Sequence, residues 1–196
     1  MTAKVVARKA ALKAQLLEIA EQRIAEGGLS ALRARDLAKE AGCSVGAIYN
    51  VYEDLNALIM AVNGRTFRAL GQAVGAAVAE SGPMKPQDQL IVMSTAYLGY
   101  AAEHTRLWRA LFDLEMSADG PVPDWYLKEL AAVFGLIAVP LREIYPNKGP
   151  EDLDLMVRAL FSSVHGIVLL GLEQRISGVP LGQIEKMIAA VLREIG

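Results

Sequence analysis

The sequence has few of the residues that build disulfides, metal centres and active sites. It contains one cysteine, Cys43, and two histidines, His104 and His165, in 196 residues. A single cysteine forms no disulfide within the chain and excludes the multi-cysteine zinc patterns, as expected in a reducing compartment. His-Glu-x-x-His, glycine-rich phosphate-loop and Gly-x-Ser-x-Gly motifs are absent. We therefore expect no enzyme, no metal and no cofactor.

Long hydrophobic runs are absent as well. The longest, residues 131–141, has 11 residues, whereas a membrane span needs about 18. The polar and basic start of the chain lacks the apolar stretch and cleavage site of a signal peptide. With 53% apolar residues and a net charge of −2, the composition is also far from that of disordered chains. These absences favour a soluble, cytoplasmic, globular protein with no membrane partner.

No alternation of apolar and polar residues marks a strand, and helical spacing dominates instead. We expect an all-α chain of about nine helices. The first 52 residues carry eight Lys and Arg against five Asp and Glu, and the remaining residues carry 12 against 17. A basic N-terminal region followed by an acidic remainder is typical of a protein whose basic region binds a polyanion. A solvated N-terminal tail explains the same charges equally well.

Residues 36–52 have the pattern of a helix-turn-helix. Ala38 is small enough for two helices to cross closely, Gly42 suits the left-handed backbone of a turn, and Ile48 is an apolar anchor facing the first helix. The other face of the second helix is small and polar, which suits contact with a DNA groove. An ordinary helical hairpin is the alternative.

Residues 9–62 resemble the DNA-binding region of the TetR-family transcriptional regulators. The residues that carry the resemblance are Gly27, Leu37, Ala38, Ala41, Gly42, the run at residues 44–49, Tyr52 and Leu58. A weaker echo, His165-Gly166 after Val164, resembles the so-called WHG ligand-binding domain. The resemblance implies a helix-turn-helix DNA-binding domain of three helices at residues 1–53. It also implies a larger helical bundle at residues 54–196 for effector binding and dimerisation.

The resemblance also implies which residues contact DNA. Asn50 is the best candidate for a hydrogen bond to a base edge, with a solvent-facing or capping amide as the alternative. Leu55 stands where the family commonly has a lysine that donates to a phosphate. Either the cations of the N-terminal arm and of the second helix compensate, or binding is weaker and its salt dependence shallower. The residues expected at the duplex are Arg33, Arg35, Ser44, Val45, Gly46, Ala47, Tyr49 and Asn50.

In the larger domain the resemblance implies an effector pocket and a dimer interface. Aromatic residues at helical spacing fill cores as readily as they line pockets, and an apolar stripe faces its own core as readily as a partner. The expected pocket residues are Met93, Tyr97, Trp108, Phe112, Trp125, Phe161 and His165. The expected interface residues, on the last two helices, are Val157, Leu160, Val164, Val168, Ile184, Ile188 and Val191.

Together these features predict a ligand-responsive transcriptional regulator, most often a repressor in this family. It would bind a near-palindromic operator in double-stranded DNA as a homodimer and be released by a small hydrophobic effector. The alternative is a helical ligand-sensing or protein-interaction module whose DNA binding is weak or lost.

Overall fold

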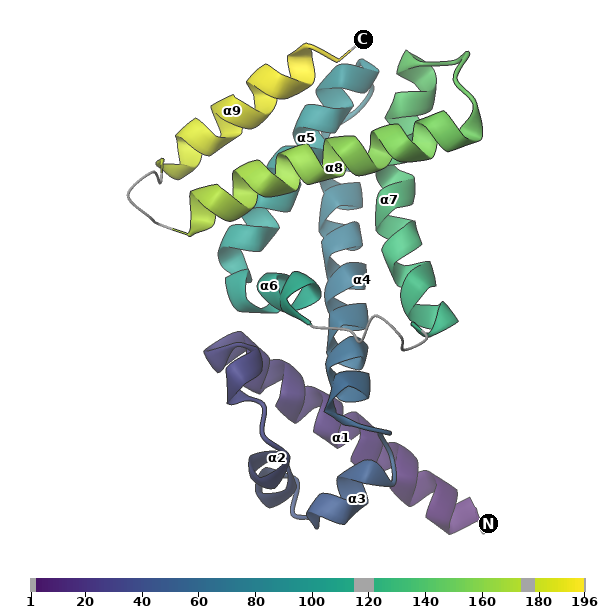
Figure 1. The fold of residues 1–196 in the computed structure, drawn as a ribbon, viewed down its shortest axis with the longest axis vertical. Helices are drawn as coiled ribbons and strands as arrows, with labels where there is room; N and C mark the ends of the chain where they lie inside the picture. The colour runs from purple at the N-terminus through teal and green to yellow at the C-terminus, as the bar shows by residue number, and fades with distance from the viewer. Residues whose placement is uncertain (1–2, 115–121, 174–178, 196) are drawn as a thin grey trace. The chain divides into compact units, whose positions relative to one another are not determined.

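The computed structural model describes residues 3–114, 122–173 and 179–195. These residues form nine α-helices and no strand (Figure 1), which confirms the predicted all-α fold. The helices are α1 (Ala3–Gly27), α2 (Ala34–Glu40), α3 (Val45–Tyr49), α4 (Leu55–Ser81), α5 (Pro86–Glu103), α6 (Thr105–Asp113), α7 (Asp124–Ile144), α8 (Pro150–Leu172) and α9 (Leu181–Arg193).

The chain packs as two compact units. The first comprises Met1–Thr66 and His104–Pro123, and the second comprises Phe67–Glu103 and Asp124–Gly196. Helix α6 belongs to the first unit because it packs against α1, and the buried Asn63 amide donates to the Ala110 carbonyl at 2.9 Å. The boundary between the two compact units therefore differs from the functional boundary expected between residues 53 and 54. That functional boundary stays a prediction.

The first unit is built on α1, which begins at Ala3, well before its buried face. Residues 3–26 contain no glycine or proline and many alanines, so the helix continues through the basic segment expected to be an arm. Its buried face meets α2, α3 and the start of α4 in one apolar core. The largest buried side chains of this core are Leu16, Ile24, Leu37, Ile48 and Leu58.

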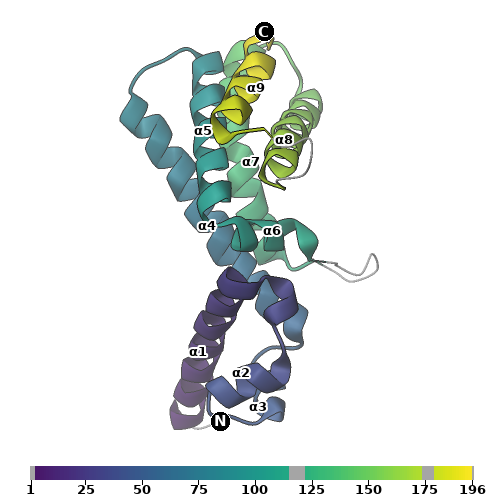
Figure 2. The same ribbon diagram turned by 90° about the vertical axis from the view of Figure 1, so that its left-hand side faces the viewer.

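The second unit is a helical bundle in which α5 packs against α7, α8 and α9 (Figure 2). Helices α8 and α9 also pack against each other. A methyl group at Gly171 of α8 would clash with the side chain of Ile184, so glycine permits the close approach of α9. The rows of buried apolar residues on α8 and α9 therefore pack inside the bundle of the same chain.

Candidate nucleic-acid interface and ligand pocket

A tight turn sets the direction of α3 relative to α2. The Cys43 N–H donates to the Ala38 carbonyl at 2.9 Å, and Gly42 between them has φ 64°, the left-handed conformation that glycine adopts most readily. Ser44 then caps α3, because its hydroxyl oxygen accepts a hydrogen bond from the Ala47 N–H at 3.2 Å. These contacts form the helix-turn-helix that the sequence predicted at these residues.

Helix α3 buries one side chain completely, packs Val45 partly against the same core and leaves Tyr49 exposed. Ile48 is completely buried, whereas the neighbouring Tyr49 is 46% exposed. A methyl group added at Gly46 would meet no atom within 4 Å, so the packing of the chain itself does not require glycine there. The eight residues expected at DNA are all exposed or half-buried: Arg33, Arg35, Ser44, Val45, Gly46, Ala47, Tyr49 and Asn50.

The end of the helix-turn-helix is fastened to α1 through Tyr52. Its buried hydroxyl donates to the Lys13 carbonyl at 3.0 Å, and the Lys13 ammonium lies 5.2 Å from the centre of the ring. Burial raises the pKa of the Tyr52 hydroxyl above its usual value, so this donor stays protonated at neutral pH. The tie holds α3 in place without using an exposed residue of that helix.

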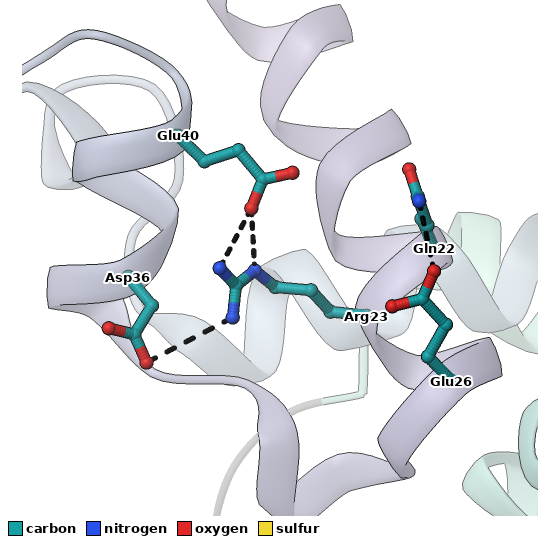
Figure 3. A network of polar contacts seen from close by, with 5 residues as sticks. All are labelled: Gln22, Arg23, Glu26, Asp36 and Glu40. Carbon is teal, nitrogen blue, oxygen red and sulfur yellow. Dashed lines mark hydrogen bonds and ion pairs between the residues drawn. The ribbon is translucent and has the colours of Figure 1, made fainter.

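In the first unit, an arginine of α1 forms ion pairs with the acidic residues of α2. The Arg23 guanidinium of α1 lies between two carboxylates of α2, 2.8 Å from Glu40 and 3.9 Å from Asp36 (Figure 3). These partly exposed pairs add little stability, but they engage both acidic side chains of α2. The two arginines at the start of α2, Arg33 and Arg35, form no ion pair with any residue that the structure describes.

An open groove runs between the start of α1 and the helix-turn-helix. It has a volume of about 680 Å³. Arg8 and Lys9 line it from α1, and Ser44 and Asn50 line it from the opposite side. Both cations are exposed. The groove therefore places positive charge beside the polar residues that flank α3.

Leu55 begins α4 and is half-buried against the core of the first unit. The preceding Asp54 caps α4, since its carboxylate accepts a hydrogen bond from the Ala57 N–H at 2.6 Å. A leucine offers no side-chain donor. The missing lysine is thus not replaced at this point, and exposed cations of α1 and α2 are the available substitutes.

The second unit contains a small, partly open apolar cavity of about 50 Å³. It brings together three of the expected pocket residues, Met93, Tyr97 and Phe161. His165 lies behind them, with its Nδ1 2.8 Å from the Tyr97 hydroxyl and its ring stacked on Phe161. The remaining lining residues are Val74, Leu90, Ser94, Val133, Leu136, Ile137, Leu160 and Val164.

Besides His165, three expected pocket residues do not line this cavity. Trp108 and Phe112 lie on α6 in the first unit, where their rings meet edge to face at 5.6 Å. Trp125 is exposed near the start of α7. The sequence reasoning favoured aromatic residues and so missed the aliphatic wall that α7 contributes. The apolar run at residues 131–141 was the available signal for that wall.

Protonation of His165 is predicted to destabilise the second unit. Burial lowers the pKa of its imidazole, so the unfolded chain takes up a proton more readily as the pH falls through about 6.5. The stability present at neutral pH is therefore lost progressively below that value. We expect denaturant unfolding of His165→Gln to vary less between about pH 7.5 and 5.5 than that of the wild type. His104→Gln is the control, and equal pH dependence of His165→Gln and the wild type would refute the assignment.

The structure places most of the expected dimer residues inside the bundle of the chain itself, and their part in a dimer stays a prediction. Six of them are buried within the chain's own bundle: Val157, Leu160, Val164, Val168, Ile184 and Ile188. They pack within the bundle of α5, α7, α8 and α9. This is the alternative that the sequence left open, in which the apolar stripe faces the chain's own core. Val191 alone of the seven is exposed, at 42%. The large apolar side chains that α8 and α9 expose are Leu155, Leu170, Leu181, Met187 and Val191.

The described residues thus form a helix-turn-helix unit and a helical bundle with an apolar cavity. The family model described as "Tetracyclin repressor-like, C-terminal domain" matches residues 90–195. The chain therefore belongs to the TetR family of transcriptional regulators, as the sequence resemblance implied. Among curated proteins, none matches the sequence.

Solved structures share this fold at low sequence identity. A protein of unknown function from Rhodococcus sp. RHA1 is 23% identical, with a TM-score of 0.72 over 92% of this chain and 93% of that one. FadR from Bacillus subtilis, in complex with stearoyl-CoA, is 14% identical, with a TM-score of 0.70 over 92% and 97%. RolR, in complex with resorcinol, is 21% identical, with a TM-score of 0.69 over 96% and 89%.

Proposed function

We propose that the protein is a cytoplasmic regulator that binds a near-palindromic operator as a homodimer and releases it when a small effector binds. Repression is the proposed mode of regulation. The observation that carries the proposal is the outward face of α3. It exposes Gly46 and Tyr49, and the residues around it lie beside cations that form no ion pair with the residues that the structure describes.

DNA recognition would divide between base edges and phosphates. Asn50 and Tyr49 extend from the end of α3 and are the candidates for base-edge and thymine-methyl contacts, and Gly46 permits close approach of the groove. Arg33, Arg35 and the cations at the start of α1 would bind phosphates in place of the lysine absent at position 55. Two such units, one from each subunit, would enter successive major grooves about 34–36 Å apart.

The homodimer would form through the outward faces of α8 and α9. Only 17% of the most apolar 18-residue window of α8 is buried within the chain, and by length and composition alone this helix could cross a membrane. A helix that is packed on one side and apolar on the other is typical of a subunit interface. Two such helices from each subunit would form a four-helix bundle.

The effector would act from the second unit. FadR and RolR hold stearoyl-CoA and resorcinol in their structures, and by this likeness we assign an effector site to the bundle of the present chain. The apolar lining of the inner cavity favours a ligand with a hydrophobic part. Such a ligand would favour a conformation in which the two recognition helices are wrongly spaced for the operator.

A ligand sensor with weak or lost DNA binding is the second candidate. Leu55 favours it, because the phosphate donor usual in the family is missing there. The two candidates differ in one property, which is sequence-specific binding to duplex DNA that weakens as the salt concentration rises.

Tyr49→Ala tests the recognition face. We expect specific operator binding to weaken by about 1–3 kcal/mol, because an exposed aromatic contact with the duplex is removed while the core is untouched. Fluorescence anisotropy with the specific duplex and with a scrambled duplex measures the change. Val6→Ala, an exposed apolar truncation on α1, is the matched control. Unchanged operator affinity of a folded Tyr49→Ala protein would reject this face as the DNA reader.

A further inference from the structure

A second hollow lies on the bundle, outside the cavity described above. It is an open groove of about 500 Å³ between the end of α7 and the start of α8, within the range of about 300–1,000 Å³ typical of small-molecule sites. Its floor is apolar, formed by Phe134, Ala138, Leu153 and Val157. The groove therefore offers a hydrophobic ligand a surface that the nearly filled inner cavity does not.

Positive charge gathers around this floor. Arg142, Lys148 and Arg158 all line the groove, and Asp154 is the single carboxylate among its lining residues. The second unit as described has eight Lys and Arg against twelve Asp and Glu. Three of the eight cations therefore converge on one groove of an otherwise acidic unit, which creates a local site for an anion.

Two of these cations are held in place by aromatic rings of the groove. The Arg158 guanidinium lies 5.7 Å from the centre of the Phe134 ring, and the Lys148 ammonium lies 6.0 Å from that of Tyr145. Arg158 also donates to Asp154 at 2.8 Å. A guanidinium on a ring keeps N–H groups at its edge, and these suit a carboxylate or phosphate. The two aromatic rings thus position the cations next to the apolar residues of the groove.

The groove shares a wall with the inner cavity. The Phe134 ring of the groove meets the Phe161 ring edge to face at 5.1 Å, and Phe161 lines the inner cavity and stacks on His165. A ligand that pressed on Phe134 would act directly on Phe161. The groove is thus physically continuous with the residues expected to bind an effector.

We propose that this groove binds a soluble anionic amphiphile. Its carboxylate or phosphate head would lie on Arg142, Lys148 and Arg158, and its hydrocarbon chain would lie on the apolar floor against Phe134. As a statement about the effector the inference rests on the proposed regulatory function, whereas the binding site itself does not. It refines the hydrophobic effector expected from the sequence into a hydrophobic chain with one negative charge.

Calorimetric titration of the full-length protein with octyl phosphate, 1-octanol and inorganic phosphate tests the proposal. Octyl phosphate should bind at least tenfold more tightly than either of the others, because it alone engages the cations and the floor together. The double variant Arg142→Gln/Lys148→Gln should bind octyl phosphate roughly tenfold or more weakly, since it loses charge-assisted hydrogen bonds. The double variant Lys128→Gln/Arg193→Gln, with the same charge change outside the groove, should bind like the wild type.

Three results would overturn the proposal. The first is that the wild type and the Arg142→Gln/Lys148→Gln variant bind octyl phosphate with equal affinity. The second is that the wild type binds octanol or inorganic phosphate as tightly as it binds octyl phosphate. The third is that octyl phosphate does not bind. The titration contains no DNA. A negative titration therefore rejects the groove proposal without rejecting the proposed regulatory function. Binding of the protein to duplex DNA tests the regulatory function separately.

Discussion

Glutamate at both Leu155 and Leu170 is expected to prevent the proposed homodimer from forming, so that the variant is a monomer at micromolar concentration. These two side chains are 67% and 63% exposed on α8, so the substitutions disturb no buried contact of the chain itself. In the proposed dimer they would lie in the interface, where an unpaired carboxylate is strongly unfavourable. Four charges in one symmetric interface should prevent association altogether.

Sedimentation equilibrium or light scattering measures the change. Leu127→Glu is the matched control, because Leu127 is 47% exposed on α7 and receives the same substitution away from α8 and α9. It should leave the dimer intact. Circular dichroism should show the helices of all three proteins unchanged. A double variant that remains a dimer with the wild-type dissociation constant would exclude this face as the interface.

Ile48→Ala is expected to lower the free energy of unfolding of the first unit by about 2–5 kcal/mol. Ile48 is completely buried and is the one residue of α3 whose side chain enters the core. Its removal leaves a cavity under a helix of only five residues, which has no stability of its own. The recognition helix should therefore lose its fixed position, and specific DNA binding should fall with the stability.

Urea unfolding, followed by circular dichroism, gives the change in stability. Val6→Ala is the control, because it truncates an exposed side chain of the same unit and should alter stability by less than about 0.5 kcal/mol. Wild-type stability of Ile48→Ala would contradict the role of Ile48 as the anchor of α3.

The helix-turn-helix could be predicted from sequence because its determinants are local. Gly42 adopts the left-handed turn, Ser44 caps α3 and Ile48 enters the core, and each feature follows from residues within a short segment. The basic start of the chain, expected to be an arm, is instead helical from Ala3. Its residues have high helix propensity but no apolar periodicity, and periodicity was the signal used.

The outward faces of α8 and α9 could not be predicted, since both sides of α8 carry apolar residues. Val164 and Val168 repeat at helical spacing and so do Leu155, Ala159 and Gly166, and periodicity alone does not say which stripe meets α5. The same limit applies to the pocket. Trp108 follows α5 closely in sequence, but α6 packs against α1 instead, and such long-range packing leaves no local signal.

Selection of binding sites from random duplex DNA by the purified protein, at two salt concentrations, tests the central claim most directly. We predict enrichment of a motif with two-fold symmetry and half-sites about one helical turn apart, and weaker enrichment at the higher salt concentration. No enrichment above background at the low salt concentration would contradict the account of the protein as a DNA-binding regulator.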